Sequence, residues 1–205
     1  MVLHYRDYGD YEAYTKHQSS KFKRVKNPDK LFTRQYNWLL ERIGSFLPFL
    51  DGRNALCLGA RSGSEVAAFR DLGFKAIGID LNPGKESDLV IPGDFHDIPF
   101  EDGSFDVVYF NSIDHALDVR KISQEIHRVL VPNGQLALEI STKLSRRDAK
   151  YFERSGIYES LVWDKTEDVV ATFEEFQTEK DLGHTTKRKK EWVGFVLRAK
   201  NAPMV

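Results

Sequence analysis

The fold of this chain is decided by residues 54–65, which read Asn54-Ala-Leu-Cys-Leu-Gly59-Ala-Arg61-Ser62-Gly63-Ser64-Glu65. The first five residues form an apolar run that suits a buried parallel strand. Gly59 and Gly63 let the backbone turn sharply and approach a ligand where a Cβ would intrude. Ser62 and Glu65 have the spacing of a helix capping box. The stretch therefore predicts a strand, a glycine turn and a helix whose free amides can face an anion.

A second apolar run, Lys75-Ala-Ile-Gly-Ile-Asp80, ends in a carboxylate that can accept hydrogen bonds from two ribose hydroxyls. The dinucleotide fingerprint does not fit, because its first, third and sixth positions, which require glycine, are Gly59, Arg61 and Ser64. No Gly-Lys-Ser/Thr sequence follows the turn, so a phosphate-binding P-loop is excluded as well. The ligand is expected to be another kind of nucleotide.

Three further motifs follow in order along the chain. They are Gly93-Asp94-Phe95-His96-Asp97-Ile98-Pro99-Phe100, Asp102-Gly-Ser-Phe-Asp106-Val-Val-Tyr-Phe-Asn111 and His127-Arg-Val-Leu-Val-Pro132-Asn-Gly134. Together with the glycine turn, they resemble the class I S-adenosylmethionine-dependent methyltransferases, specifically the type 11 methyltransferase domain. The resemblance covers roughly Arg53 to Ile140 and depends on the order and spacing of all four motifs.

The resemblance implies S-adenosyl-L-methionine as the cofactor. The residues that it places around this cofactor are Gly59, Ala60, Arg61, Gly63, Asp80, Leu81, Asp94, Phe95 and Asn111. Asp80 would hold the ribose, and Leu81 would pack beside the adenine. Asp94 would face the adenine amine; alternatively, it is an ordinary turn residue after Gly93. Phe95 would add an amide or ring contact, and Asn111 a backbone contact.

Two positions depart from the family pattern. Arg61 replaces the usual second glycine, and Cys57 stands where an acidic residue is common. The Arg61 side chain either obstructs the cofactor or pairs with its methionine carboxylate, which a guanidinium can bind through two hydrogen bonds. A protein that binds the cofactor without catalysis is therefore an open alternative.

Asp114 and His115 follow the fourth strand, where the substrate-facing loop of the family begins. A sulfonium methyl is already activated, so the protein mainly aligns the reactants, and a base is needed only if the acceptor must lose a proton. His115 is the first choice for this base, with Asp114 as its orienter or alternative. Equally, both residues could cap the helix that begins near Val119. Glu139 is a weaker candidate for a substrate contact.

The alternation of apolar strands and helical stretches predicts an α/β fold, a doubly wound, mostly parallel seven-stranded Rossmann-like sheet with helices on both faces. Expected strands lie near 54–58, 76–80, 88–91, 105–110 and 135–140, and expected helices cover 65–72 and 119–130. Beyond residue 140, a helical stretch near 146–154 and strands at 159–163 and 192–199 are expected to complete the sheet, the last strand running antiparallel by resemblance.

Residues 1–50 are expected to form an N-terminal helical extension or lid on a methyltransferase domain of residues 51–205, within a single globular unit. Tyr5, Tyr8, Tyr11 and Tyr14 recur every third residue. This stripe either covers the adenosine or packs on the domain surface. A second amphipathic helix is expected between residues 31 and 50, ending at Pro48.

The composition fits one cytoplasmic α/β domain. The chain has 205 residues, 41% of them hydrophobic, and a formal net charge of −1, so nothing global steers it towards nucleic acid or an anionic membrane. It has no run of about 18 apolar residues, and its first thirty residues are too polar for a signal peptide. The single cysteine, Cys57, has no partner for an internal disulfide. The scattered histidines predict no metal site.

A small-molecule acceptor, methylated on oxygen or nitrogen, fits this compact chain best. The alternatives are a protein or RNA methyltransferase, which would use the basic run Lys187-Arg-Lys-Lys190, and a noncatalytic module that binds S-adenosylmethionine. The basic run has acidic neighbours and also fits a solvated loop before the last strand. The sequence leaves the acceptor and the oligomeric state open.

Overall fold

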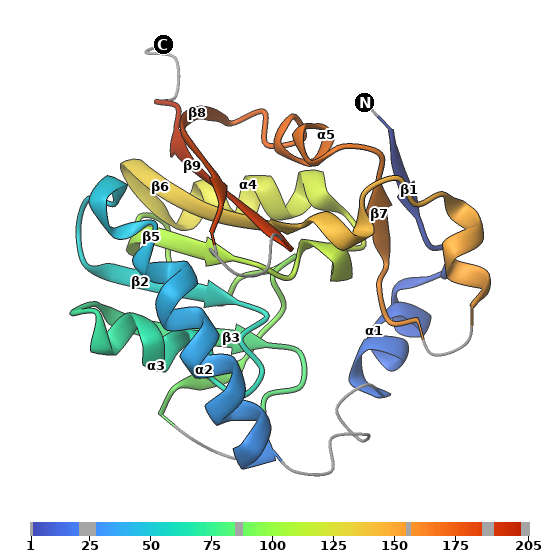
Figure 1. Ribbon diagram of the computed structural model, residues 1–205, viewed down its shortest axis with the longest axis horizontal. Coiled ribbons are helices and arrows are strands. Elements are labelled where there is room, and N and C mark those ends of the chain that lie inside the picture. Colours follow the sequence, from blue (N-terminus) through green and yellow to red (C-terminus); the bar gives the residue numbers. More distant parts are fainter. Residues whose placement is uncertain (1, 21–27, 85–87, 155–156, 186–190, 202–205) are drawn as a thin grey trace.

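The computed structural model describes residues 2–20, 28–84, 88–154, 157–185 and 191–201. Its centre is a seven-stranded sheet with the strand order β4-β3-β2-β5-β6-β9-β8 (Figure 1). The strands are β2 (Asn54–Leu58), β3 (Lys75–Asp80), β4 (Val90–Pro92), β5 (Phe105–Phe110), β6 (Leu130–Ser141), β8 (Phe176–His184) and β9 (Trp192–Ala199). The first five strands in this order are parallel, and β9 runs antiparallel to both β6 and β8. The predicted fold class is confirmed.

Helices cover both faces of this sheet (Figure 1). The described α-helices are α1 (Tyr11–Ser20), α2 (Pro28–Gly44), α3 (Ser64–Asp71), α4 (Val119–Val129) and α5 (Thr166–Val170). The 3-10 helices are η2 (Leu47–Phe49), η3 (Ile113–His115), η4 (Thr142–Leu144) and η5 (Ala149–Glu153). Side chains of α2 and α3 pack in one core cluster, and those of α4 pack in the other. The sheet therefore has an apolar core on each side.

Helix α4 shows how the sequence specifies one of these layers. Its apolar residues Val119, Ile122, Ile126 and Val129 recur at helical spacing, and each is at most 1 % exposed. Asp118 caps the helix, since its side chain accepts a hydrogen bond from the Lys121 backbone N–H. The apolar spacing thus determines which face of α4 meets the sheet.

Two sequence predictions about the C-terminal half are wrong in detail, and one strand was missed. The strand expected at 159–163 is β7 (Leu161–Trp163), and it pairs with β1 (Leu3–Tyr5) in a separate two-stranded sheet because β8 occupies the place beside β9. Strand β8 was not predicted, since it lies at the sheet edge and its side chains are mostly exposed and polar. The helix expected at 146–154 shrinks to η5, because Arg146 is left-handed (φ 60°) and Asp148 caps the shorter turn.

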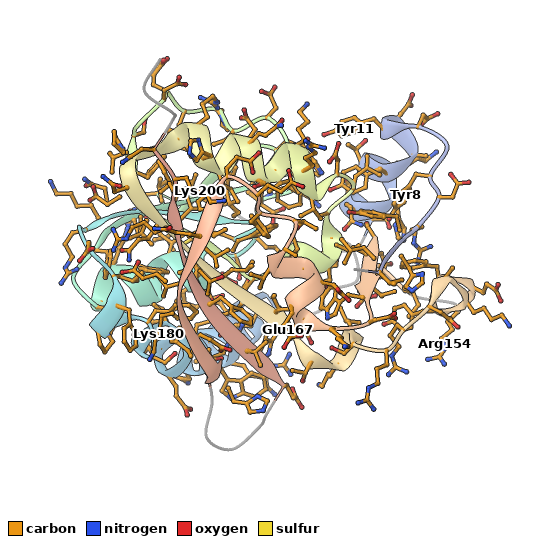
Figure 2. The ribbon with its side chains drawn as sticks, turned by 90° about the horizontal axis from the view of Figure 1, so that it is seen from above. Tyr8, Tyr11, Arg154, Glu167, Lys180 and Lys200 are labelled. Atoms are coloured by element: carbon orange, nitrogen blue, oxygen red, sulfur yellow. The ribbon has the colours of Figure 1, made fainter. Side chains whose placement is uncertain are left out.

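The tyrosine stripe does not follow one helix. Tyr5 lies in β1, Tyr8 precedes α1, and only Tyr11 and Tyr14 belong to α1. Tyr14 is fully buried, whereas Tyr5 and Tyr11 are exposed. Figure 2 shows Tyr8 and Tyr11 on this N-terminal segment, across the molecule from Lys180 on β8. The helix predicted to reach Pro48 ends at Gly44. Among the described helices, none is long and apolar enough to cross a membrane.

Candidate active site

Two adjoining cavities open where β2, β3 and β5 end. The smaller, of about 50 Å³, is lined by Tyr14, Gln18, Gly59, Arg61, Asp80, Leu81, Asn82, Phe95, Ser112 and His115. The larger, of about 320 Å³, is lined by Arg34, Gln35, Trp38, Leu39, Arg42, Gly59, Ala60, Arg61, Ser62, Glu65, Asn111, Ser112, Asp114, His115, Glu191 and Trp192. Shared walls make them neighbours at the carboxyl edge of the parallel strands, where open α/β sheets bind their ligands.

The turn after β2 requires its glycines. Gly59 has φ 67°, and a Cβ on it would lie 2.9 Å from Ser112 Oγ. Gly63 has φ 82°, and a Cβ there would lie 2.7 Å from the Leu89 Cβ. Between them, Arg61 also adopts a left-handed backbone (φ 38°), which is uncommon for a residue with a side chain. The turn is thus shaped to bring bare backbone to the mouth of both cavities.

The predicted capping box at this turn is wrong. Gly63 is the N-cap of α3 and makes no side-chain cap, and the helix begins at Ser64. The Glu65 side chain lies instead in the wall of the larger cavity. The Cβ-free Gly63 and the buried position of Glu65, which is only 8 % exposed, leave no capping geometry for the carboxylate.

Asp80 ends β3 with its carboxylate in the wall of the smaller cavity. Its Oδ1 accepts from the Asn82 backbone N–H at 2.8 Å, and its Oδ2 accepts from the Arg61 backbone N–H at 3.0 Å. Each carboxylate oxygen has lone pairs for more than one donor, so two hydroxyl groups can still be bound. These two amides hold the carboxylate in one orientation at the wall of the smaller cavity.

The turn after β4 carries two of the predicted site residues, Phe95 and Asp94, and only Phe95 lines one of the two described cavities. The Phe95 side chain is buried and lines the smaller cavity. Asp94 is turned towards His96, whose backbone N–H and Nδ1 both lie 2.8 Å from Asp94 Oδ1. Asp94 and Gly63 are absent from the described walls of both cavities. Phe95 and Leu81 thus form the apolar side of the smaller cavity.

His115 is one of the residues that line both cavities. It ends η3, and its Nδ1 lies 3.1 Å from the Tyr158 carbonyl oxygen. Because a carbonyl oxygen only accepts, this contact requires the proton on Nδ1. Asp114 Oδ2 lies 3.4 Å from that Nε2. The capping alternative for both residues is wrong, since Asp118 caps α4.

Sequence reasoning missed Glu65 as a site residue. Its carboxylate receives a hydrogen bond from Ser64 Oγ at 3.3 Å and another from the Asn111 side chain. Burial is the largest influence on it and raises the pKa of the Glu65 carboxyl, while the nearby Arg42 lowers it. The available signal was a carboxylate in the first turn of the helix that follows the glycine turn.

Arg42 is hydrogen-bonded to Glu139 rather than to Glu65. The Arg42 guanidinium donates three hydrogen bonds of 2.7–3.1 Å to the fully buried carboxylate of Glu139. Glu139 also accepts from the hydroxyl groups of Tyr109 and Thr185. The expected substrate contact at Glu139 is therefore replaced by a structural role, since this carboxylate lies outside both described cavity walls.

Aromatic and cationic side chains of α2 and β9 form the outer wall of the larger cavity. Trp38 is 51 % exposed, and the Arg34 guanidinium carbon lies 6.0 Å from its ring centroid. Trp192 is covered by Arg42, whose Cζ lies 3.9 Å from the ring centroid. An exposed tryptophan at a cavity mouth is a surface suited to a flat or apolar ligand.

Neither a metal site nor the basic run adds to this picture. The described residues contain no group of three or more histidine, cysteine, aspartate or glutamate side chains that could hold a metal ion. The run Lys187–Lys190, on which the macromolecular alternative depends, lies outside the described residues.

Comparison with known proteins identifies the domain. Residues 56–138 match the family model of the methyltransferase domain, type 11. Residues 56–138 thus carry the sequence pattern of a methyltransferase domain. The match covers β2 to β6, which contain the glycine turn, Asp80, Asp94 and His115. It confirms the predicted family, an S-adenosylmethionine-dependent methyltransferase, and with it the predicted cofactor.

Solved structures show the same fold at low sequence identity. An S-adenosylmethionine-dependent methyltransferase from Thermotoga maritima is 17% identical, with a TM-score of 0.65, and the alignment covers 90% of this chain and 100% of that one. A Pyrococcus horikoshii protein is 21% identical over 78% of this chain and 90% of that one, with a TM-score of 0.58. A Haemonchus contortus phosphoethanolamine N-methyltransferase, solved with S-adenosylhomocysteine, is 20% identical over 72% and 39%, with a TM-score of 0.56. No curated protein matched the sequence.

Proposed function

We propose that this methyltransferase transfers the methyl group of S-adenosylmethionine to an oxygen or nitrogen of a small-molecule acceptor by in-line displacement. The observation that carries the proposal is the larger cavity, which adjoins the glycine turn after β2 and is lined on its outer side by residues of α2 and β9. Its volume of about 320 Å³ lies in the range of small-molecule sites. The domain arrangement proposed from the sequence, residues 1–50 as an extension on 51–205, supplies the α2 wall.

The adenosine half of the cofactor fits the smaller cavity and its surroundings. Asp80 is proposed to bind the ribose hydroxyls, with Leu81 and Phe95 beside the adenine and Asp94 facing its amine. The Asp80 carboxylate, held by two backbone amides, and the apolar side chains of Leu81 and Phe95 match the two chemical halves of a nucleoside. Tyr14 and Gln18 from α1 close this side of the site.

The methionine half is proposed to lie against the turn of Gly59, Ala60, Arg61 and Gly63, and against Asn111. A Cβ at Gly59 would clash with Ser112, so bare backbone is required beside the ligand. Among the described residues, the Arg61 guanidinium forms no ion pair within the chain, which leaves it able to pair with the methionine carboxylate. The buried Glu65 carboxylate supplies a matching partner for the ammonium group.

The chain's own residues contribute alignment and proton handling. When bound, the cofactor supplies an activated methyl group. His115 Nε2 is proposed to take the proton of an acceptor hydroxyl or ammonium group, and Asp114, whose Oδ2 lies 3.4 Å from Nε2, would stabilise the resulting imidazolium. Trp38 and Trp192 would hold an apolar or flat part of the acceptor. A cytoplasmic location remains part of the proposal on the sequence grounds given above.

The first test is calorimetric titration with S-adenosylmethionine and S-adenosylhomocysteine, with NAD as a control ligand and Asp80→Ala as a control variant. Binding of both sulfur ligands that is lost in Asp80→Ala and absent for NAD is expected. Transfer of radiolabelled methyl to the low-molecular-weight fraction of a cell extract would then support a small-molecule acceptor. Label only in protein or RNA would contradict that acceptor class, and no binding by the wild type would contradict the proposal as a whole.

A further inference from the structure

His96 is a buried ring that touches three of the elements building the site. It follows Phe95 in the turn after β4 and is 3 % exposed. Its ring packs edge-on against Tyr14 of α1, with centroids 5.6 Å apart and an interplanar angle of 87°. Tyr11 of the same helix packs on it in the same manner at 6.4 Å. A polar ring buried this deeply needs a hydrogen-bond partner for each nitrogen.

Its hydrogen bonds determine which nitrogen carries the proton. The backbone N–H groups of Leu117 and Asp118 both donate to Nε2, each at 3.2 Å. Because Nε2 accepts, the proton of the neutral ring lies on Nδ1, which donates to Asp94 Oδ1 at 2.8 Å. One imidazole therefore joins the Asp94 carboxylate, in the turn after β4, to the loop between η3 and α4.

That loop adjoins the candidate base. Leu117 lies two residues after His115, and Asp118 caps α4. On the other side of the loop, the Tyr14 hydroxyl donates to the His115 carbonyl oxygen at 3.1 Å. The Asp94 carboxylate is therefore connected through the His96 ring to the backbone beside His115, and α1 contacts both the ring and the His115 carbonyl.

We propose that His96 is a positioning residue that couples occupancy of the adenine subsite at Asp94 to order in the loop of residues 116–118 beside His115. The inference rests on the cofactor site proposed above. An adenine amine bound to the Asp94 carboxylate restrains that carboxylate and, through Nδ1, the ring that holds the two loop amides. Since coupling between two sites is reciprocal, loss of the loop contact also weakens cofactor binding.

The test is amide hydrogen exchange, measured by NMR with and without S-adenosylhomocysteine. In the wild type, the ligand is expected to slow exchange of the Leu117 and Asp118 amides by about fivefold or more, the lower end of ordinary coupling between sites. Two variants separate the halves of the connection. His96→Asn keeps an amide donor near Asp94 but is too short to reach the loop, and His96→Gln places a carboxamide oxygen near the two loop amides.

Both variants are expected to lose the response of these amides to the ligand. The two variants differ when no ligand is present. The Leu117 and Asp118 amides should exchange faster in His96→Asn than in the wild type, whereas in His96→Gln their exchange rates should stay close to those of the wild type. Ligand-induced protection that is unchanged in His96→Asn overturns the proposal. A wild type that binds the ligand in calorimetry without protecting these amides also overturns it, and this comparison needs no variant. A wild type that binds no ligand refutes the proposed function itself, which the titration reports separately.

Discussion

Replacement of Glu65 by glutamine tests the proposed methionine subsite most directly. Glu65 is 8 % exposed and lines the larger cavity, and the nearby Arg42 guanidinium is hydrogen-bonded to Glu139. A hydrogen bond between charged groups contributes about 1.5–3 kcal/mol. Glu65→Gln retains the shape and loses the charge, so the affinity for S-adenosylhomocysteine should fall by about 10–150-fold.

The assay compares two ligands by calorimetry. S-adenosylhomocysteine carries the ammonium group, whereas 5′-methylthioadenosine lacks it and keeps the nucleoside. Glu65→Gln should weaken only the first, and the exposed Glu101→Gln should weaken neither. Equal losses for both ligands would mean that Glu65 acts through the fold, and unchanged affinity for S-adenosylhomocysteine would refute the assignment.

The same variant has an opposite effect on the stability of the unliganded protein. Burial raises the pKa of the Glu65 carboxyl in the folded state above its usual value. A raised carboxyl pKa means that stability is fully present below the unfolded pKa and is lost as pH rises through the folded pKa. Glu65→Gln removes this loss, so its melting temperature relative to the wild type should rise as pH increases from below the ordinary carboxyl pKa. A relative decrease over this range would contradict the sign.

Three shorter predictions concern the turn and the buried charges. Gly59→Ala should lower the free energy of unfolding by about 1–3 kcal/mol in urea titration, because a Cβ at φ 67° would also meet Ser112 within 3 Å; no change would show that the turn can relax. Arg42→Met should cost about 3–5 kcal/mol by the same measurement, because it leaves the buried Glu139 carboxylate without its cation, and a loss under 1 kcal/mol would contradict this. The hydrogen bond from Arg128 lowers the pKa of the Glu125 carboxyl, so the stability that Glu125 contributes is present above the unfolded pKa and is lost as pH falls through the folded pKa. Glu125→Gln should therefore flatten the acid side of a plot of melting temperature against pH. An unchanged acid side would refute this prediction.

Local patterns in the sequence were sufficient to predict the parallel sheet and the glycine turn after β2. The strand at 54–58 and the strand at 105–110 have the predicted bounds, because buried parallel strands are short apolar runs that neighbouring residues already delimit. Gly59 and Asp80 meet at one cavity because the carboxyl ends of parallel strands lie along one edge.

Only the tertiary structure decided where side chains of distant segments meet. Glu65 and Ser62 have capping-box spacing, yet Glu65 turns into a cavity that α2 and β9 close, and neither element carries a site motif. His96 resembles a polar turn residue until the loop at 117–118 folds onto its Nε2. Strand β7 pairs with β1, which lies more than 150 positions earlier in the chain, and not with a strand of the main sheet. Spacing along the chain determines local backbone geometry, whereas the partner of a side chain depends on contacts between segments that no local pattern encodes.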